Sequence, residues 1–427
     1  MKLESYWLDT APPFERAAQG DVSGRADVAV VGGGFTGLSA ALALARRGAD
    51  VVVLEADRVV GEASGRNGGQ CNCGLAHDYA ALAQSLGRPL ARAFYLAYSA
   101  AVDTVERVIR DAAIDCDFQR RGRLKLAAKP AHYDKLARSC EVLRAEVDPN
   151  VELVPRERLR DEVASDIFFG GLLQTTSAQL HVGRFGVGLA HAAAGQGARI
   201  YESAPVTALE RDSDGSYRVT STRGTVRASQ VLIATGSTSH ASGPFGWFRR
   251  RLAPVGSFIV VTEPLDPALL ARLLPKRRSY VTSKNIGNYF RATPDGRLLF
   301  GGRARFAMSN PRSDAKSGRI LQAALAQVFP ELRDTRIDYC WGGLVDITAD
   351  RLPRAGQHDG LYYSLGYSGH GVQMSVHMGE AMVDVMEGRS EANPWRELDW
   401  PAIPAHFGKP WFLPLVGAYY RVQDILH

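Results

Sequence analysis

The first residues that could do chemistry are the glycines of the run Gly32-Gly33-Gly34-Phe35-Thr36-Gly37. Residues 27–31 before this run read as a short buried strand, and residues 38–47 after it read as an apolar helix. Gly32 allows a tight turn, Gly34 lets the backbone approach a pyrophosphate, and Gly37 lets the helix sit close to the strand. The free N–H groups at the start of the helix then face negatively charged phosphates. The run therefore predicts a dinucleotide-binding turn.

A carboxylate follows the next strand, at the place where it can bind a ribose. Residues 51–54 form a β-branched strand that ends on Glu55. Glu55 is placed to accept hydrogen bonds from a ribose diol, and its charge would repel the 2′-phosphate of NADP. The predicted cofactor contacts in this half of the site are Gly32, Gly34, Phe35, Thr36, Gly37, Glu55, Ala56 and Arg58.

A second loop of glycine and small polar residues, 61–70, follows the Glu55 strand directly. A nicotinamide dehydrogenase usually continues there into another strand–helix unit, whereas a flavoprotein needs small residues so that the isoalloxazine ring can lie against the backbone. The loop resembles a segment that members of the D-amino-acid oxidase superfamily carry beside the flavin. The resemblance implies that the cofactor is FAD, in contact with Ser64, Gly65, Arg66, Asn67, Gly68, Gly69 and Gln70.

Three later segments also resemble this superfamily. Residues 231–236 look like the strand that returns under the FAD, and residues 204–209 look like the strand whose backbone meets the adenine. Near the C-terminus, strand 361–365 runs into a glycine-rich turn, and a helix from Gly371 would aim its positive end, about half a charge, at the flavin pyrimidine edge. That field raises the electron affinity of the flavin. The predicted contacts in these segments are Val206, Ala234, Thr235, Gly236, Gly369, His370, Gly371, Val372 and Gln373.

The elements that position these motifs predict an α/β protein, α+β overall, with more than one domain. Because the cofactor motifs are scattered along the chain, the Rossmann-type FAD-binding domain must be discontinuous. Residues 79–167 are mostly helical in pattern, and strands alternate with turns over 254–336. These stretches predict a smaller mixed-sheet substrate domain with helices, with the active site between the two domains. We assign 25–80, 168–250 and 337–400 to the FAD-binding domain, 81–167 and 251–336 to the substrate domain, and 401–427 to a C-terminal helical tail.

Segments along nearly the whole chain resemble the gamma-glutamylputrescine oxidoreductases, an amine-oxidising branch of the superfamily. The segments are 5–7, 63–70, 163–166, 297–302 and 366–371. This resemblance implies an enzyme of polyamine (putrescine) catabolism that oxidises a primary amine to an imine, which hydrolyses to an aldehyde, with oxygen as acceptor and hydrogen peroxide as product. Three alternatives stay open: a D-amino-acid or sarcosine-type oxidase, a dehydrogenase that passes electrons to a quinone or carrier protein, and a non-catalytic FAD-binding protein.

The chemistry of amine oxidation suggests which residues form the site. Hydride leaves only from the neutral amine, so an apolar aromatic cavity that penalises the ammonium would promote the reaction. The expected walls are Tyr289, Phe290, Trp341 and Tyr367. His370 either assists with the proton or only hydrogen-bonds the flavin or backbone. A carboxylate on the substrate calls for an arginine fork, supplied by Arg291 or Arg303, and Arg66 is expected to clamp the cofactor or the backbone.

Two features bear on how the flavin is held and reoxidised. The sarcosine-oxidase branch has a lysine on the strand that faces the flavin, where this chain has Leu299, which leaves oxidase or dehydrogenase open. Cys71 and Cys73 follow the flavin loop and either link FAD covalently or pack as small residues under the ring, and we expect packing and non-covalent FAD. No other Cys/His pair has metal-ligand spacing, so no metal is expected.

Composition limits the partners. The net charge of +6 is mild and scattered, which argues against a nucleic-acid partner and leaves a small-molecule amine as the expected one. No segment approaches the ~20 apolar residues of a membrane span, and no signal peptide is evident. Five sparse cysteines favour a reducing, cytoplasmic location. The aromatic end, 406–427, is expected to pack as a helix on the core, with contact to a membrane surface as the alternative.

Overall fold

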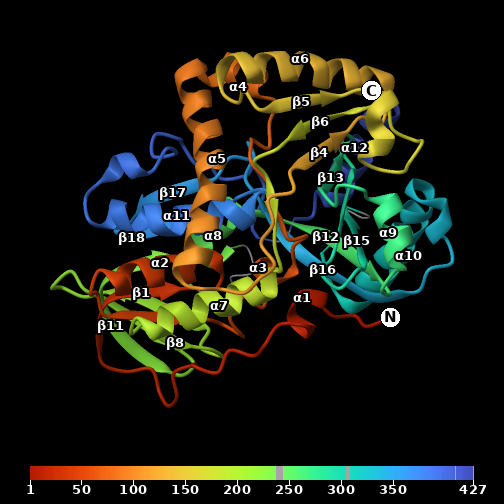
Figure 1. Cartoon of the computed structure of the whole chain (residues 1–427). Coiled ribbons are helices and arrows are strands. Elements are labelled where there is room, and N and C mark those ends of the chain that lie inside the picture. Colours follow the sequence, from red (N-terminus) through yellow and green to blue (C-terminus); the bar gives the residue numbers. More distant parts are fainter. Residues whose placement is uncertain (237–243, 304–307, 409, 427) are drawn as a thin grey trace.

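The computed structural model describes residues 1–236, 244–303, 308–408 and 410–426. Two large β-sheets, each of eight strands, organise the chain, with helices packed around them (Figure 1). In that view the first sheet lies on the left, and the second lies on the right and toward the top. The mixed α/β fold with a Rossmann-type unit confirms the predicted fold class.

The first sheet contains the predicted strand–helix–strand unit. Its strands follow the order β17 (Arg354–His358), β18 (Leu361–Leu365), β11 (Gly224–Ile233), β1 (Arg25–Val31), β2 (Val51–Leu54) and β8 (Arg199–Tyr201), and β10 (Tyr217–Ser221) also pairs with β11 and carries β9 (Val206–Arg211) on its other side. The strands from β18 to β8 pair in parallel. All residues of β2 are buried, as expected for a parallel strand covered on both faces. Helix α2 (Phe35–Arg46) packs against α7 (Val182–Gly195) and α11 (Gly371–Met386).

The second sheet is mixed. Its order is β16 (Ile337–Ile347), β12 (Ala253–Thr262), β15 (Leu298–Gly302), β14 (Asn288–Ala292), β13 (Ser279–Thr282), β4 (Arg123–Leu126), β6 (Gly171–Gln174) and β5 (Val151–Val154). Helix α10 (Pro311–Val328) packs on β12 and β16, and α6 (Pro130–Glu146) packs on β5 and β6. The remaining two-stranded sheet pairs β3 (Gln70–Cys71) with β7 (Ala178–Gln179). The shorter helices are α1 (Tyr6–Asp9), α3 (Ala63–Arg66), α4 (Tyr79–Leu86), α8 (Gly246–Arg249), α9 (Pro267–Leu273), and the 3₁₀ turns Arg156–Asp161, Pro330–Leu332 and Ser390–Ala392.

Two strands depart from the predicted domain boundaries, and the division itself stays a prediction. Strands β6 and β16 lie in segments assigned to the FAD-binding domain, yet both hydrogen-bond into the second sheet. Their partners, β4 and β12, are far away in sequence, and local patterns do not encode such pairing. The predicted segments also include 237–243 and 304–307, which lie outside the described residues.

The long helix α5 (Arg88–Asp111) links the helical region to the cofactor half of the molecule. It lies within residues 79–167, where the sequence predicts a mostly helical pattern. One of its faces is buried against α11 and α4, and in Figure 1 it rises from the first sheet toward α6.

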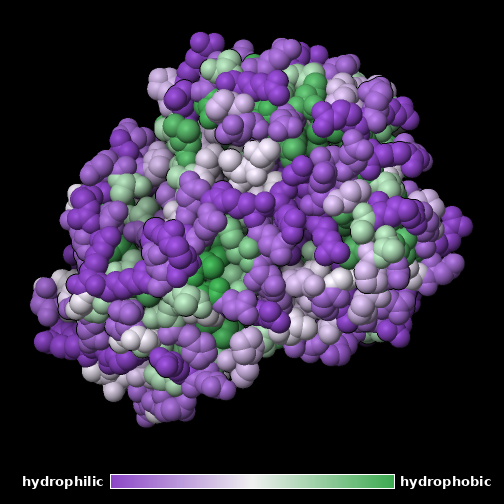
Figure 2. Space-filling view, viewed as in Figure 1, coloured by the Kyte–Doolittle hydropathy of each residue, from purple (hydrophilic) through white to green (hydrophobic). Residues whose placement is uncertain are grey.

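The C-terminal helix α12 (Leu413–Leu426) contacts the turn between β13 and β14, where the Asp424 carboxylate accepts from the backbone N–H groups of Asn285 and Ile286, both at 2.8 Å. Its outer side exposes Leu415, Tyr419 and Val422. Among the helices of the described ranges, none combines the length and hydropathy that a membrane crossing needs. The face in Figure 2 is mostly hydrophilic, with hydrophobic residues in small separate groups.

His181 couples the stability of this fold to pH. Its Nδ1 accepts the Arg184 N–H as the N-cap of α7, and its Nε2 lies 2.9 Å from the Thr10 hydroxyl, which itself donates to the Tyr6 carbonyl. This arrangement uses the neutral ring with its proton on Nε2. Burial, with the charge of Arg184, lowers the pKa of His181 to about 4. Protonation would remove the cap and place a positive charge at the positive end of the helix.

We expect stability to fall as the pH drops from 6.5 toward 4. The folded pKa of His181 is below its unfolded value, so the unfolded chain binds more protons in this window and stability is complete only above about pH 6.5. The contribution at stake is on the order of 3 kcal/mol. His181→Asn keeps a capping acceptor, so its melting temperature should fall less between pH 7 and pH 5 than that of the wild type. Equal falls in differential scanning calorimetry would contradict this role.

Candidate active site

A cavity of about 930 Å³ lies between the two sheets and collects most of the predicted site residues. The predicted residues that line it are Gly32, Gly34, Phe35, Thr36, Glu55, Ala56, Ser64, Arg66, Asn67, Gly68, Gln70, Val206, Ala234, Thr235, Gly236, Tyr289, Arg303, Tyr367, Gly369, His370, Gly371 and Val372. The predicted residues outside its lining are Gly37, Arg58, Gly65, Gly69, Phe290, Arg291, Trp341 and Gln373. Segments far apart in the sequence are thus brought to one place by the two sheets.

The glycine-rich turn has the close packing that a dinucleotide site needs. A Cβ on Gly37 would stand 1.9 Å from the Gly32 carbonyl oxygen, so only glycine lets α2 approach β1 this closely. Gly32 has a φ of +111°, and a side chain there would meet the Ala234 carbonyl. Gly37 therefore lies behind the cavity wall and shapes it without lining it. Helix α2 begins at Phe35, so its N-terminus faces the cavity.

Glu55 is held in the position expected for a ribose ligand. Its Oε2 accepts from the Gly33 N–H at 2.6 Å and its Oε1 accepts from the Asp57 N–H at 3.0 Å. Burial raises the pKa of Glu55, and these two hydrogen bonds oppose the rise. Ala56 and Asp57 line the cavity beside it, whereas the predicted Arg58 does not.

The loop 61–70 is clamped from outside by residues of distant elements. The Ser5 hydroxyl donates to the Gly65 carbonyl at 2.7 Å, and the Trp7 indole donates to the Asn67 carbonyl at 2.7 Å. Arg66 donates to the Gly61 carbonyl, which confirms its expected backbone contact. These contacts hold the loop against one side of the cavity.

The structure corrects the prediction that Trp341 is a wall of the site. Its side chain is fully buried, and its indole N–H donates to the Arg66 carbonyl at 2.9 Å. Trp341 therefore supports the loop from behind. Because the sequence predicts only that Trp341 is buried, it does not distinguish these two roles.

Arg291 is also placed differently from the prediction. Its guanidinium is buried beneath the loop and donates to the Gly69 carbonyl at 2.6 Å, the Leu180 carbonyl at 3.0 Å and the Ala292 carbonyl at 3.1 Å. It also packs over the ring of Trp7. With its donors directed at backbone carbonyls, Arg291 is a structural arginine and not a carboxylate ligand.

Phe290 is the third correction. Its ring stacks between Tyr280 and Phe300 in the core of the second sheet, at centroid distances of 5.0 and 5.8 Å. Successive side chains of a strand point to opposite faces, so Tyr289 and Phe290 cannot both face the cavity.

Two tyrosines line the cavity as expected. The ring of Tyr289 lies against Gly68 and Gly301, where a Cβ on either glycine would overlap it, and its hydroxyl is 3.2 Å from that of Ser257. The Tyr367 hydroxyl lies 2.9 Å from that of Thr36 and 2.8 Å from that of Ser364. Burial raises the pKa of each tyrosine to about 12, so both are neutral phenols at pH 7.

His370 stands at the N-terminus of α11, where its backbone N–H donates to the Tyr367 carbonyl. Its Nδ1 is buried and has no hydrogen-bond partner among the described residues. Burial, followed by the charges of Arg123, His77 and Arg351, lowers the pKa of His370 to about 3. The ring is neutral and weakly basic, which favours the hydrogen-bonding role over the proton-accepting one.

Other polar atoms near the N-terminus of α11 also lack hydrogen-bond partners among the described residues. Within the described part of the chain, Gln373 Oε1 and Asn72 Oδ1 are buried without hydrogen bonds, although Gln373 Nε2 donates to the Asn72 carbonyl at 2.6 Å. Gln373 itself stands behind the lining. Orphaned acceptors beside a helix N-terminus, together with the glycine turn and Glu55, fit a polar cofactor of the size of FAD.

The remaining candidates have plain packing roles. Cys71 and Cys73 are buried outside the lining of the cavity, and the Cys73 sulfur lies 3.2 Å from the Ser177 hydroxyl, so packing is the role that the structure supports. Burial raises the pKa of the Cys71 thiol, which opposes its reaction as a thiolate. Leu299 is fully buried and pairs with Arg291 across β14 and β15.

Sequence reasoning missed a group of cations that lines the cavity. Arg123 and Lys125 project from β4, and Arg351 lies in the turn before β17. On β4 they alternate with the fully buried Leu124 and Leu126, a pattern that predicts one polar face. The pattern alone does not predict that this polar face lines the cavity.

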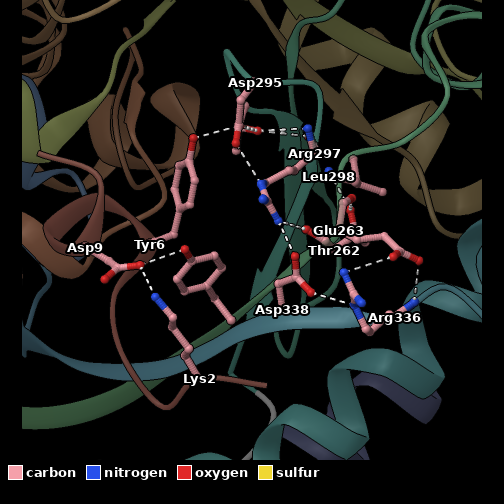
Figure 3. A network of polar contacts seen from close by, with 12 residues as sticks. Lys2, Tyr6, Asp9, Thr262, Glu263, Asp295, Arg297, Leu298, Arg336 and Asp338 are labelled. Carbon is pink, nitrogen blue, oxygen red and sulfur yellow. Dashed lines mark hydrogen bonds and ion pairs between the residues drawn. The ribbon is translucent and has the colours of Figure 1, made fainter.

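A polar network ties the N-terminal segment to the second sheet and so supports the clamp of Ser5 and Trp7 (Figure 3). The Tyr6 hydroxyl donates to Asp295 at 2.7 Å, and Arg297 bridges Asp295 and Asp338 at 2.7 and 2.6 Å. Asp9 accepts from Lys2 at 2.7 Å, beside Tyr6. The loop at the cavity is thus anchored through helix α1 to strands of the other sheet.

The chain matches the family model described as FAD dependent oxidoreductase over residues 27–385. Among similar proteins, gamma-glutamylputrescine oxidoreductase of Escherichia coli (strain K12) is 33% identical over 94% of this chain and 93% of its own length. Glycine oxidase of Geobacillus kaustophilus (strain HTA426) is 27% identical over 86% of this chain and 94% of its own length.

Solved structures show the same fold. A crystal structure of glycine oxidase from Geobacillus kaustophilus matches with a TM-score of 0.74 and 23% identity, covering 90% of this chain and 99% of that one. L-Proline dehydrogenase from P. horikoshii matches with a TM-score of 0.72 and 19% identity, covering 88% of this chain and 98% of that one.

Proposed function

The chain belongs to the family of FAD-dependent oxidoreductases, and from this premise we propose that it oxidises the carbon–nitrogen bond of an amine, with gamma-glutamylputrescine as the substrate. The product would be an imine, which water converts to an aldehyde, and oxygen would be reduced to hydrogen peroxide. When bound, FAD supplies the acceptor for the hydride of the amine. The observation that carries the proposal is the single cavity in which the cofactor-binding residues meet Tyr289, Tyr367 and Arg303.

The cofactor is FAD, and the chain offers it three kinds of contact. The N-termini of α2 and α11 would face its negatively charged or electron-accepting parts, Glu55 would bind the ribose, and the clamped loop 61–70 would pack against the ring system. Val206 and the turn of Ala234 and Thr235 complete the lining.

The residues around the substrate favour the neutral amine. An alkylamine has a pKa near ~10.4 in water, so it enters as an ammonium that must lose one proton. The enclosed walls of Tyr289 and Tyr367 penalise that charge. His370, neutral at pH 7, can accept or donate a hydrogen bond but does not need to hold the proton.

A second candidate is an amino-acid oxidase, because similar proteins include glycine oxidases and Arg303 could bind a carboxylate on the reacting carbon. The two candidates differ in where the carboxylate sits. In an amino acid it is one bond from the reacting carbon, and in gamma-glutamylputrescine it is at the far end.

The anaerobic visible spectrum of the purified yellow protein tests the proposal. We expect gamma-glutamylputrescine to bleach the flavin absorbance, and air to restore it with release of peroxide. Slow recovery in air with rapid reduction of an electron-accepting dye would point instead to a dehydrogenase. Bleaching by glycine or sarcosine, and not by gamma-glutamylputrescine, would replace the proposal with the amino-acid candidate.

A further inference from the structure

Three cations line the cavity without an acidic partner, and we call Arg123, Lys125 and Arg351 the cationic cluster. Within the described part of the chain none of them forms an ion pair with a carboxylate, whereas many arginines elsewhere in the protein do. Arg303, one of the two predicted carboxylate ligands, also lines the cavity, and burial followed by the charge of Arg351 lowers its pKa. Arg123 is half-buried, whereas Lys125 and Arg351 are exposed where they line the cavity, so an acidic ligand that enters the cavity could contact all three cations.

The members of the cluster stand close enough to influence one another. Enclosure by protein, followed by the charges of Arg123 and others, lowers the pKa of Lys125 to about 8. The Lys125 side chain is nevertheless exposed, because it projects into the open cavity. It stays mostly protonated at pH 7, so the cluster carries nearly three positive charges there.

The guanidinium of Arg123 is fixed by a neighbouring side chain and keeps an N–H donor that no described residue accepts. Its guanidinium donates to Gln174 Oε1, while its Nε is buried and has no acceptor among the described residues. Gln174 in turn donates to the hydroxyl of Tyr95, so the arginine is fixed from behind. An unsatisfied, buried donor of a charged group calls for an acceptor that enters from the cavity.

Arg351 shows a further sign of a built site. Its backbone has a φ of +59°, in the left-handed region that a side chain other than glycine seldom adopts. A strained backbone conformation of this kind persists only where the surrounding structure fixes the residue in place. This turn adds a third cation to the same cavity lining, and its charge acts on Lys125.

The cluster comes from other elements than the glycine turn and Glu55, although all of them line one cavity. Arg123 and Lys125 belong to the second sheet, whereas the glycine turn and Glu55 belong to the first. The titratable groups that interact with the cluster include His77, Asp78 and His370, and His370 is also a predicted cofactor contact at the N-terminus of α11. Asp78 is directed to the Ser139 hydroxyl and the Ala81 N–H and forms no ion pair with the cluster.

We infer that Arg123, Lys125 and Arg351 form an anion subsite that binds the acidic end of the substrate, remote from the reacting nitrogen. This inference rests on the proposed function for the identity of the amine, but the subsite itself does not. The chemistry that completes it is a carboxylate, whose oxygens accept several hydrogen bonds from arginine and lysine. The sequence assigns this role to Arg291 or Arg303, and the structure adds three cations while removing Arg291.

Two amines that differ at the far end test the subsite in the FAD-loaded enzyme. Gamma-glutamylputrescine carries a carboxylate and the neighbouring α-ammonium there, and N-acetylputrescine has the same amide without either group. In Arg123→Gln and in Lys125→Met, we expect KM for gamma-glutamylputrescine to rise by about 10- to 100-fold, the loss of a charge-assisted hydrogen bond. KM for N-acetylputrescine should change less than about twofold by the same reasoning. Equal rises for both amines, or none, would overturn the inference.

Binding without turnover separates this inference from the proposed function. If neither amine bleaches the flavin, the proposed substrate fails, and glutarate binding to the FAD-loaded protein still tests the subsite by calorimetry. We expect glutarate to bind the wild type and to bind at least about tenfold more weakly to either variant. Arg158→Gln and Lys276→Met remove exposed charges outside the cavity lining and should change nothing. Undetectable binding to the wild type, unchanged binding in the variants, or a parallel loss of FAD would overturn the inference.

Discussion

Gly37→Val is expected to yield a folded protein that does not retain FAD. The first atom of the new side chain would stand 1.9 Å from the Gly32 carbonyl oxygen and 3.1 Å from a methyl group of Val30. Both obstacles belong to β1 and its turn, so the overlap can be relieved only if α2 moves away from the sheet. The N-terminus of α2, which must face the pyrophosphate, would move with it. The ratio of flavin absorbance to protein absorbance after gel filtration measures the loss.

Gly246→Ala is the matched control for this substitution. Gly246 is also a helical glycine, but a Cβ there meets no atom within 4 Å. The control should keep its FAD. A Gly37→Val protein that purifies with wild-type flavin content would show that the turn tolerates a wider separation between helix and strand.

Local sequence patterns predict cofactor contacts, most of which the structure brings together at one cavity. The glycine turn, the strand that ends on Glu55 and the turn before α11 each combine a period, a glycine and a boundary within a few residues. These features can be predicted without knowledge of the tertiary structure, because the tight turn and the free N–H groups are properties of the local backbone.

The substrate half was harder to predict, since its residues meet only through pairing of the second sheet. Strand alternation alone could have excluded Phe290 once Tyr289 was placed in the cavity. Lys125 could not be found in that way, because its role depends on β4 lying beside β13, more than a hundred residues away. The alternating pattern predicts only that the Lys125 side chain lies on the polar face of β4. That this face lines the cavity depends on the pairing of the sheet.

Arg291 illustrates the same limit with a functional consequence. Arg291 and Tyr289 lie two positions apart on β14 and therefore share a face. That face is open at Tyr289 but covered at Arg291 by the loop 61–70, which returns from the other half of the molecule. Arg291, predicted to bind the substrate, therefore holds the loop 61–70 in place instead.

We expect Arg291→Leu to lower the free energy of unfolding by about 3–5 kcal/mol and to weaken FAD binding. The leucine would leave the carbonyls of Gly69 and Leu180 without their donor in a buried place. Each unsatisfied buried group costs about 1–3 kcal/mol. Gly69 has a φ of +67° and lies between Gly68 and Gln70, which line the cavity, so its displacement would disturb the wall where FAD would bind. Urea unfolding followed by tryptophan fluorescence, and FAD titration of the apoprotein, measure the two effects.

Arg303→Leu separates support of the loop from recognition of the substrate. Arg303 lines the cavity, whereas Arg291 does not. The Arg303 variant should keep the wild-type unfolding energy and FAD affinity while KM for a carboxylated amine rises. Arg291→Lys should fall between wild type and leucine, because one ammonium cannot reach all the carbonyls that the guanidinium fork serves. A stable Arg291→Leu protein with normal FAD binding, and a raised KM only for carboxylated amines, would return Arg291 to the substrate site and refute its structural role.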